Sequence, residues 1–525
     1  MKSYYQHLSS TREFGEKENI LKKPILRSSA IFPVVQNEFY SSTIHFLGYW
    51  LLKRNIPEVT LVITLRNSDG NTLSRQTQII NSAKAFSINL DKILNEINYT
   101  GNSFVGSIET EFHTTRDMVF PYPALVLEYQ NEQFNTCVHT LGRIYNDLED
   151  LKENDATQVP ETGFDIHETD DLKSFLSFVN GPLENKDGII EYTLTNSNSK
   201  KSSGTFHIGK INPFETKLLY LNEYIPNLTE FLNNNSGSIS LKHNFEGFYP
   251  RLLVGNIQKS SPSVSFTHSY YDCTSCTTES DYWSRIDANH FDSSIYVPIF
   301  NKNNQFTNLI IYPNMSPSNV TLKIDLHDKN GKKIVENSDF LKIDSREKKL
   351  IKINLNEIIS SNNLPNDNFA AHIITTFQNN KIPSRIKFGL NVGNYESNFK
   401  LPCNICFNMR MGNPLVENKP GSFHWAPILS ERNTVLALGN FSTLQNYEKT
   451  ANLEFNFYRI EDSSNFSEKI SLSPNSEKRF SIDDFKLKDF LKTEGWVTIK
   501  ADNPYVHGYY FNLNSSGSIS GDHVF

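Results

Sequence analysis

The chain contains few cysteine, methionine and tryptophan residues, and it lacks long apolar runs. Five cysteines in 525 residues form an odd, scattered set, unlike the dense, even set of a disulfide-stapled secreted domain. No stretch approaches the roughly 18 consecutive apolar residues that a membrane-spanning helix needs. The N-terminal residues also lack the apolar core of a secretory signal. We therefore expect no membrane span and a cytoplasmic location, with export by a route without a classical signal as the alternative.

A basic surface and the common catalytic motifs are missing as well. The net charge is -7, and adjacent lysines occur only as short pairs such as Lys200-Lys201. Nucleic-acid binders need Lys and Arg gathered on one face, so we exclude nucleic acid as a partner. The sequence has no GxxxxGK[ST] loop, no GxGxxG turn, no HExxH and no GxSxG, which are signatures of several large enzyme classes. We therefore expect a non-catalytic protein rather than an enzyme.

Aromatic and β-branched residues are abundant. Phenylalanine occurs 37 times and tyrosine 23 times, and apolar residues make up 38% of the chain. Such residues favour the half-buried surface of a β-sheet. A chain of this length is too long for one hydrophobic core, so the composition indicates several β-domains.

The strongest signal is an internal repeat with a period of about 130 residues. Residues 59–70 read VTLVITLRNSDG and residues 320–331 read VTLKIDLHDKNG, while 188–196 and 451–459 hold related runs. Each alternates apolar and polar residues, and the first two end in a glycine turn, which is typical of a half-buried strand entering a hairpin. The pattern predicts one such hairpin in each of four modules.

A second repeated element predicts a strand followed by one helical turn. It occurs at residues 85–94, 217–225, 349–359 and 478–485, where an alternating run meets an Asn or Asp and then apolar residues. The polar residue is expected to cap the helical turn. Prolines at 33, 298 and 427 mark the first strand of three modules, where proline indicates an edge strand or a strand start.

These elements predict an all-β chain of four tandem β-sandwich modules with little helix. About seven short strands per module resemble an immunoglobulin-like or fibronectin-like sandwich, without the Cys…Trp…Cys pattern of true immunoglobulin domains. The predicted boundaries are a polar N-terminal segment at 1–27 and modules at 28–155, 162–276, 291–410 and 420–525. The only plausible amphipathic helix lies at 140–154. We expect an elongated rod or arc in which each module mostly contacts its neighbours.

Three of the four modules end their last strand on a histidine. Residues 254–268 and 509–523 share four serines and the terminal histidine without a gap, and the related stretch of the first module ends at His139. The equivalent residues are therefore His139, His268 and His523. Two interpretations remain open: inherited packing, in which the imidazole bonds a neighbouring loop, or repeated ligand sites at the module junctions.

Two CxxC pairs suggest a metal site. Thiolates at this spacing can turn towards one zinc ion, and histidines lie near both pairs in the sequence. The candidate ligands are Cys273, Cys276, His268 and His290 at the second junction, and Cys403, Cys406 and His424 at the third. The alternative is that these thiols are reduced and fill small gaps near the linkers.

Aromatic and acid–base candidates complete the set of site residues. Exposed tyrosine faces could stack on sugar rings, and an Asp beside a His could form an acid–base pair. The candidate ligand-binding residues are Tyr270, Tyr271, Asp272, His139, Asp522 and His523.

Three functions remain open from these patterns. The first is a non-catalytic binding or scaffold protein for a glycan or protein partner. The second is a polysaccharide-related enzyme with a metal or His/Asp site at a module junction. The third is a structural component of a surface or virion assembly.

Overall fold

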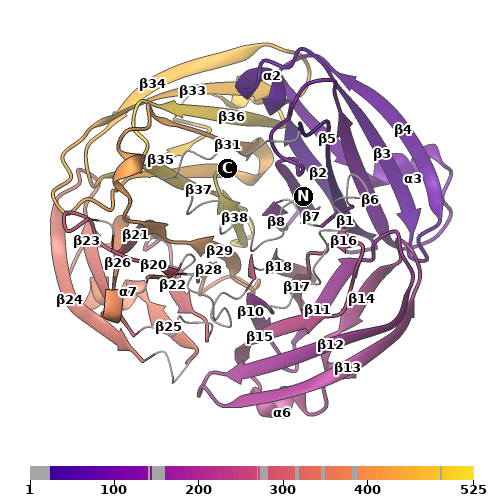
Figure 1. Ribbon diagram of the computed structural model, residues 1–525, viewed down its shortest axis with the longest axis horizontal. Coiled ribbons are helices and arrows are strands. Elements are labelled where there is room, and N and C mark those ends of the chain that lie inside the picture. The colour runs from indigo at the N-terminus through magenta and orange to yellow at the C-terminus, as the bar shows by residue number, and fades with distance from the viewer. Residues whose placement is uncertain are drawn as a thin grey trace. The chain divides into compact units, whose positions relative to one another are not determined.

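The computed structural model describes most of the chain, in two compact units. The described residues are 24–139, 142–144, 160–268, 270–271, 282–285, 287–313, 319–344, 349–380, 382–383, 387–484 and 487–525. Unit 1 comprises Met1–Tyr271 and unit 2 comprises Asp272–Phe525. Figure 1 labels the strands and helices of the two units.

The first sandwich of unit 1 has two antiparallel four-stranded sheets, in the orders β1-β6-β3-β4 and β5-β2-β7-β8. Phe46 and Phe112, from opposite sheets, meet edge to face with ring centroids 5.5 Å apart. Its elements are β1 (Arg27–Gln36), β2 (Ser41–Leu47), α2 (Tyr49–Lys53), β3 (Val59–Asn67), β4 (Thr72–Ile80), β5 (Ala85–Asn89), α3 (Leu90–Glu96), β6 (Phe104–His113), β7 (Leu125–Gln130) and β8 (Asn135–His139).

The second sandwich of unit 1 has the sheet orders β13-β12-β15-β10-β19 and β14-β11-β17-β18, and a short pair of strands, β9 and β16, connects it to the first. Its elements are β9 (Arg143–Ile144), β10 (Glu161–His167), β11 (Leu172–Val179), β12 (Asn185–Asn196), β13 (Lys201–Ile211), β14 (Thr216–Tyr220), α5 (Leu221–Tyr224), α6 (Leu228–Phe231), β15 (Ser236–His243), β16 (Phe248–Tyr249), β17 (Leu253–Gln258), β18 (Ser263–His268) and β19 (Tyr270–Tyr271).

The first sandwich of unit 2 has the sheet orders β24-β23-β26-β21-β30 and β25-β22-β28-β29, and a separate pair joins β20 to β27. Its elements are β20 (Tyr282–Trp283), β21 (Ser293–Ile299), β22 (Gln305–Ile311), β23 (Val320–His327), β24 (Lys333–Ile343), β25 (Ile351–Asn354), α7 (Leu355–Ser361), β26 (Phe369–Phe377), η3 (Gln378–Asn380), β27 (Ile382–Pro383), β28 (Lys387–Asn394), β29 (Cys403–Asn408) and β30 (Arg410–Met411).

The second sandwich of unit 2 has the sheet orders β31-β36-β33-β34 and β35-β32-β37-β38. Its elements are η4 (Pro414–Val416), β31 (Ser422–Leu429), η5 (Ser430–Arg432), β32 (Thr434–Asn440), β33 (Ala451–Arg459), β34 (Asn465–Leu472), β35 (Glu477–Ser481), α8 (Lys488–Leu491), β36 (Glu494–Ala501), β37 (Val506–Leu513) and β38 (Ile519–His523).

All four sandwiches share one topology. When the eight main strands of each are numbered in chain order, one sheet reads 1-6-3-4 and the other reads 5-2-7-8. The prediction of an all-β chain of tandem sandwiches with little helix is confirmed, although each has eight main strands rather than about seven. The order differs from the ABED and CFG sheets of an immunoglobulin constant domain, so that likeness is one of architecture. The exact module boundaries remain predictions.

Local sequence signals explain the repeated elements. The turns after β3 and β23 close through bonds from the amides of Gly70 and Gly331 to the carbonyls of Asn67 and Asp328. Pro33 lies on β1, an edge strand of its sheet, as the proline pattern predicts. The strand that begins the pattern at 85–94 ends at Asn89, which caps α3 by accepting a bond from the Lys92 amide.

The predicted caps hold in only some of the repeats. Asn354 also caps its helix, α7, by accepting a bond from the Asn356 amide. In the second sandwich Asn222 lies inside α5, and the N-cap position is Tyr220. In the fourth, Asp484 instead accepts a bond from the amide of Ser481 within a turn. The short helices therefore follow the strands as expected, but the capping residue varies.

The predicted helix at 140–154 is wrong in its described part. Arg143 and Ile144 form strand β9, which pairs with Tyr249 and Phe248 of β16. The Ile31 amide also bonds to the Gly142 carbonyl at 2.7 Å. Backbone pairing to both sandwiches outweighs the local helical pattern here. Residues 140–141 and 145–154 lie outside the described residues.

Within each unit the two sandwiches pack closely against each other instead of being connected only by a linker. In unit 1 the β3–β4 turn docks on the 212–216 segment, where the Thr216 amide bonds to the Ser68 carbonyl at 2.8 Å. A Cβ on Gly70 would lie 2.2 Å from the Pro213 carbonyl oxygen. In unit 2 a Cβ on Gly331 would lie 2.2 Å from the Pro474 carbonyl oxygen. Both units thus use the same docked turn.

An arginine lies on an aromatic ring at each of these junctions. In unit 1 the Arg66 guanidinium lies 4.2 Å from the Phe214 ring centroid and pairs with Glu109 at 2.8 Å. In unit 2 the Arg479 guanidinium lies 4.3 Å from the Phe300 centroid and donates to the Ile299 carbonyl at 2.8 Å. Burial raises the pKa of Glu109, and Arg66 opposes this rise. Each junction therefore contains a cation–π contact between an arginine and a phenylalanine ring.

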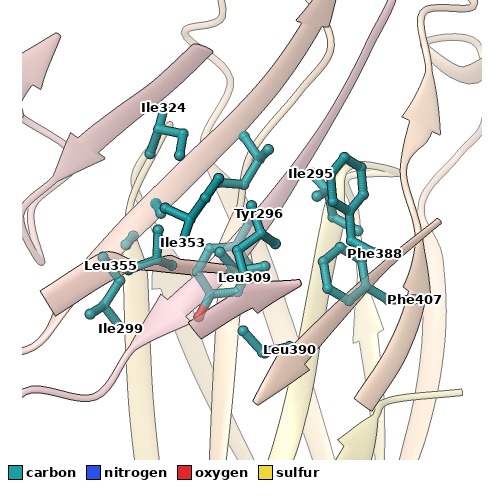
Figure 2. Close-up of a cluster of buried hydrophobic side chains, with 14 of the residues drawn as sticks. Ile295, Tyr296, Ile299, Leu309, Ile324, Ile353, Leu355, Phe388, Leu390 and Phe407 are labelled. Carbon is teal, nitrogen blue, oxygen red and sulfur yellow. The ribbon is translucent and has the colours of Figure 1, made fainter. Parts of the chain in front are cut away.

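The core of unit 2 runs from one sandwich into the next. One cluster of buried side chains contains residues of both sheets of the first sandwich together with Phe441, Tyr509 and Phe511 of the second. Figure 2 shows part of this cluster, including Phe388 and Phe407, whose rings stack with centroids 6.0 Å apart. A shared core makes the paired sandwiches, rather than the single sandwich, the packing unit.

Candidate functional site

Two of the predicted terminal histidines meet in unit 1. Nε2 of His268 lies 3.0 Å from Nε2 and 3.3 Å from Nδ1 of His139. The rings are nearly perpendicular, with centroids 4.2 Å apart. His268 is buried and His139 is half-buried. We call these two residues the histidine pair.

The strands that end on these histidines hold the pair in place. β8 belongs to the first sandwich and β18 to the second, and the amide of Phe266 bonds to Thr136 Oγ1 at 3.4 Å. The Phe266 ring also packs edge to face on Tyr129, with centroids 4.7 Å apart. The histidine pair therefore lies at the junction of the two sandwiches of unit 1.

A buried polar network lies on the same face of the sheet as His139. His45 Nε2 is 2.8 Å from Glu128 Oε2, and both side chains are buried. Asn135 Nδ2 donates to Glu128 Oε1 at 2.7 Å and approaches Cys137 Sγ at 3.7 Å. Cross-strand partners share a face of a sheet, and Glu128 is opposite Cys137 while Val126 is opposite both His45 and His139.

Sequence reasoning missed this network. The signal was present, because His45 and Glu128 are polar residues flanked by apolar ones in strands that are buried along nearly their whole length. A strand whose polar positions are also buried has a covered second face. Only the cross-strand register brings the two residues together.

The predicted metal site at Cys403 and Cys406 does not fit the structure. Both cysteines are buried in strand β29, and they are not joined by a disulfide. Residues three apart on a strand project to opposite faces. Cys403 joins the core with Ile405 and Phe407, so Cys406 faces the other way. The two sulfurs do not converge on one ion.

The histidines assigned to the metal sites have other contacts. His424 Nδ1 is 3.0 Å from the Phe525 carbonyl oxygen, and its Nε2 is 3.0 Å from that of Val506. His290 is buried, with Nε2 2.7 Å from Glu417 Oε1 and Nδ1 3.5 Å from Asp287 Oδ2. His424 and His290 belong to unit 2, whereas His268 belongs to unit 1. Cys273 and Cys276 lie outside the described residues, so that part of the prediction remains untested.

The remaining predicted ligand residues are placed as follows. Asp522 accepts a bond from the backbone amide of His523 at 2.8 Å, and His523 Nδ1 is 3.0 Å from the Val524 carbonyl oxygen. Tyr270 and Tyr271 form β19, which pairs with β10, and their side chains are outside the described set. Asp272 also lies outside the described residues. Asp522 therefore orients the backbone of the last strand.

A second candidate surface lies in the loop between β6 and β7. Val119, Phe120 and Tyr122 are 40%, 38% and 46% exposed, and Leu26, at 48%, belongs to the segment that the loop contacts. The Phe120 and Tyr122 rings have centroids 6.1 Å apart, and Arg54 lies 5.7 Å from the Phe120 centroid. We call residues 114–124 with Leu26 the aromatic loop.

The aromatic loop is held in a defined conformation. The amides of Met118 and Thr114 bond to the carbonyls of Ile25 and Leu26, and the Ser29 amide bonds to the Pro121 carbonyl. Val119 adopts φ +72°, a left-handed conformation that is rare for a β-branched residue. Backbone strain of this kind gathers at functional positions. No pattern in the sequence points to this loop, since its aromatics alternate with prolines rather than with strand residues.

Comparisons with known proteins provide no family for this chain. No protein-family model matches it, and no curated protein matches it either. Among the described residues, no helix is both long and apolar enough to cross a membrane. Any statement of function therefore depends on the surfaces described above.

Proposed function

We propose that the chain is a non-catalytic binding or scaffold protein that presents the aromatic loop to a glycan or protein partner. The observation that carries this proposal is the group of exposed apolar side chains at Leu26, Val119, Phe120 and Tyr122. Adjacent exposed apolar groups on a surface are typical of interaction sites. Aromatic residues with a neighbouring arginine are the residue types that dominate binding energy.

The paired sandwiches supply the rigid frame that such a loop needs. A loop whose backbone is already ordered loses less conformational entropy on binding. The strained Val119 backbone fits a surface whose shape is maintained for recognition. The cytoplasmic location belongs to this proposal and is supported by the buried Cys137, Cys403 and Cys406, which form no disulfide among the described residues, because thiols persist in reducing compartments.

The test compares the aromatic loop with an exposed tyrosine elsewhere. The labelled full chain is applied to a glycan array, and a photocrosslinking amino acid is placed at Tyr122 in cells that produce the protein. Phe120→Ala and Tyr122→Ala should each reduce binding about tenfold or more. Tyr395→Ala, at a 65% exposed position in unit 2, should leave binding unchanged. Binding that Phe120→Ala and Tyr395→Ala affect equally, or no partner in either assay, would refute the proposal.

A second candidate function is an enzyme acting on polysaccharide at a sandwich junction. The observation in its favour is the histidine pair, because two imidazoles at a junction can act as metal ligands or in proton transfer. Hydrolysis of a polysaccharide panel by the wild-type chain, lost in His268→Gln, would support this function over the first.

A further inference from the structure

Arginines that lie on phenylalanine rings also hold a carboxylate at three places in the described part of the chain. In each, the guanidinium contacts the ring and forms an ion pair with Asp or Glu. The sets are Arg66 with Phe214 and Glu109, Arg459 with Phe490 and Asp462, and Arg479 with Phe300 and Glu477. A guanidinium can do both, because its N–H groups lie in its plane and its faces remain open to a ring.

Arg54 has the ring without the carboxylate. Its guanidinium lies 5.7 Å from the centroid of Phe120 in the aromatic loop. Among the described residues it forms no ion pair and no side-chain hydrogen bond, and its Nε atom is buried. A desolvated N–H group without an acceptor is unfavourable. An acidic group from another molecule would complete the arrangement that the other three arginines have.

The backbone fixes Arg54 beside the aromatic loop. Arg54 directly follows helix α2, and its amide bonds to the Trp50 carbonyl at 3.0 Å. Trp50 is fully buried and packs on Phe112, with ring centroids 4.5 Å apart. On the other side, Arg116 of the loop donates to the Asn55 carbonyl at 3.1 Å. The arginine and the loop are therefore held together before any partner binds, which lowers the entropy lost on binding.

The charge around the aromatic loop is positive, unlike that of the whole chain. Lys53 and Arg116 are exposed and add to the charge of Arg54. The acids beside them are Asp117, which accepts bonds from two backbone amides, and Glu58, whose carbonyl bonds to the start of the loop. Three cations thus accompany two acids, in a chain whose net charge is -7. A local excess of positive charge favours a partner that carries carboxylates.

The apolar part of the surface favours a peptide over a sugar. The Phe120 and Tyr122 rings are inclined by 43°, so one sugar face cannot lie flat on both. Leu26 and Val119 expose aliphatic groups, which gain more from contact with apolar side chains than with hydroxyl groups. A segment with Asp or Glu next to a large apolar residue matches both the arginine and the apolar groups.

We propose that the aromatic loop and Arg54 together bind an acidic–apolar peptide segment of a partner protein. In this complex a carboxylate of the segment pairs with Arg54, and an apolar side chain packs on Phe120 and Tyr122. The inference rests on the proposed function, because it names the partner of the same surface. It narrows that function from a glycan or protein to a protein segment of stated chemistry.

The test begins with a displayed library of random 12-residue peptides, selected on the full chain. Selected peptides should be enriched in Asp or Glu next to Leu, Ile or Phe. Labelled synthetic copies are then titrated with the protein by fluorescence anisotropy. Arg54→Gln, which removes no hydrogen bond among the described residues, should weaken binding about tenfold or more. Arg459→Gln, at an arginine whose carboxylate partner is Asp462 in unit 2, should leave binding unchanged.

A second set of peptides tests the ion pair itself. Replacing the acidic residue of a selected peptide by Asn or Gln should weaken binding to the wild-type chain as much as Arg54→Gln does. The same replacement should have no further effect on binding to Arg54→Gln, because both changes remove one interaction. Independent, additive losses would overturn the pairing of the carboxylate with Arg54.

The remaining outcomes separate this inference from the proposed function. Selected peptides that lack acidic residues, or that bind Arg54→Gln as well as wild type, overturn the inference, and the proposed function survives if Phe120→Ala weakens their binding. Selection of no peptide also overturns the inference. Polygalacturonate and phosphatidylserine vesicles are titrated in parallel, and Arg54-dependent binding to either one without peptide binding assigns the site to a glycan or a lipid surface instead. Peptide binding that Phe120→Ala and Tyr395→Ala affect equally overturns both proposals.

Discussion

Single glycines decide how the two sandwiches of a unit dock. Gly70 has φ +85°, and a Cβ there would lie 2.2 Å from a backbone oxygen of the second sandwich. Gly209 has a similar φ of +79°, but a Cβ there would meet nothing within 4 Å. The two positions therefore separate the cost of the left-handed conformation from the cost of the contact.

We expect Gly70→Ala to destabilise the protein more than Gly209→Ala. The left-handed conformation costs a non-glycine residue about 1–2 kcal/mol, which is the full effect expected at Gly209. At Gly70 the new Cβ must also displace the Pro213 carbonyl. We therefore expect a total loss of unfolding free energy of at least about 3 kcal/mol there. Guanidinium chloride unfolding followed by the fluorescence of Trp50, buried in unit 1, measures both. Equal losses of unfolding free energy in the two variants would show that the docked turn contributes nothing to stability.

Residue-level prediction from the sequence worked where the cause is local. The glycine turns and the Asn89 and Asn354 caps depend on a few neighbouring residues, so the pattern was sufficient to find them. The Asn222 cap was wrong because the helix of that repeat starts earlier, at Leu221. The docking role of Gly70 was not visible in the sequence, because its partner, Pro213, is far away in the chain.

At the scale of the element, strand β29 shows why the cysteine prediction failed. CxxC spacing brings two sulfurs together in a turn or a helix start, whereas a strand separates them. The run CNICFN forms a strand, and the strand conformation, rather than the cysteine spacing, decides where the two sulfurs point. The sequence predicted His139 and His268 as candidate site residues. It did not show that they contact each other, because their strands, β8 and β18, belong to different sandwiches.

The strand geometry of β29 has a chemical consequence. Burial raises the pKa of the Cys403 thiol well above its ordinary value, so the reactive thiolate is scarce. In the folded protein we expect Cys403 and Cys406 to react with a thiol reagent at least about 100-fold more slowly than after unfolding. Mass spectrometry of alkylated peptides at pH 7.5 measures this. Rapid modification of both cysteines, or a disulfide between them, would contradict their placement on opposite faces.

At the scale of the whole molecule, unit 2 carries buried neutral histidines at its sandwich junction. Burial lowers the pKa of His372 to about 3, and it also lowers those of His327 and His507. His327 and His372 both pack on Phe441, and their Nε2 atoms have no hydrogen-bond partner among the described residues. Unit 1 has Arg66 and Glu109 at its own junction.

Unit 2 should lose stability as the pH falls below about 6.5. An unfolded histidine binds a proton near pH 6.5, whereas folded His372 stays neutral until about pH 3. The unfolded state therefore binds more protons, and His372 alone removes about 3 kcal/mol by pH 4. Unfolding at pH 7 and pH 4, followed by the fluorescence of Trp496 in unit 2, measures the loss. His372→Gln should reduce the pH dependence and His207→Gln should not. A loss that both variants retain in full would contradict this account.

The pairing of sandwiches could not be predicted from the repeat alone. A period of about 130 residues describes single modules, and tandem modules with short linkers suggested a rod. The shared core of unit 2 arises from Phe441, Tyr509 and Phe511, which the sequence presents as ordinary strand and loop residues. Tertiary packing between modules follows from shape and burial, and neither is encoded by a local period.

The docked turn also defines the repeating unit of the chain. Gly331 follows Gly70 by 261 positions, and Pro474 follows Pro213 by the same 261 positions. A turn and the segment that receives it depend on each other, because the contact between them needs both. Their common offset means that the spacing between the two sandwiches of unit 1 recurs in unit 2. The element that this chain repeats as a whole is therefore the pair of sandwiches.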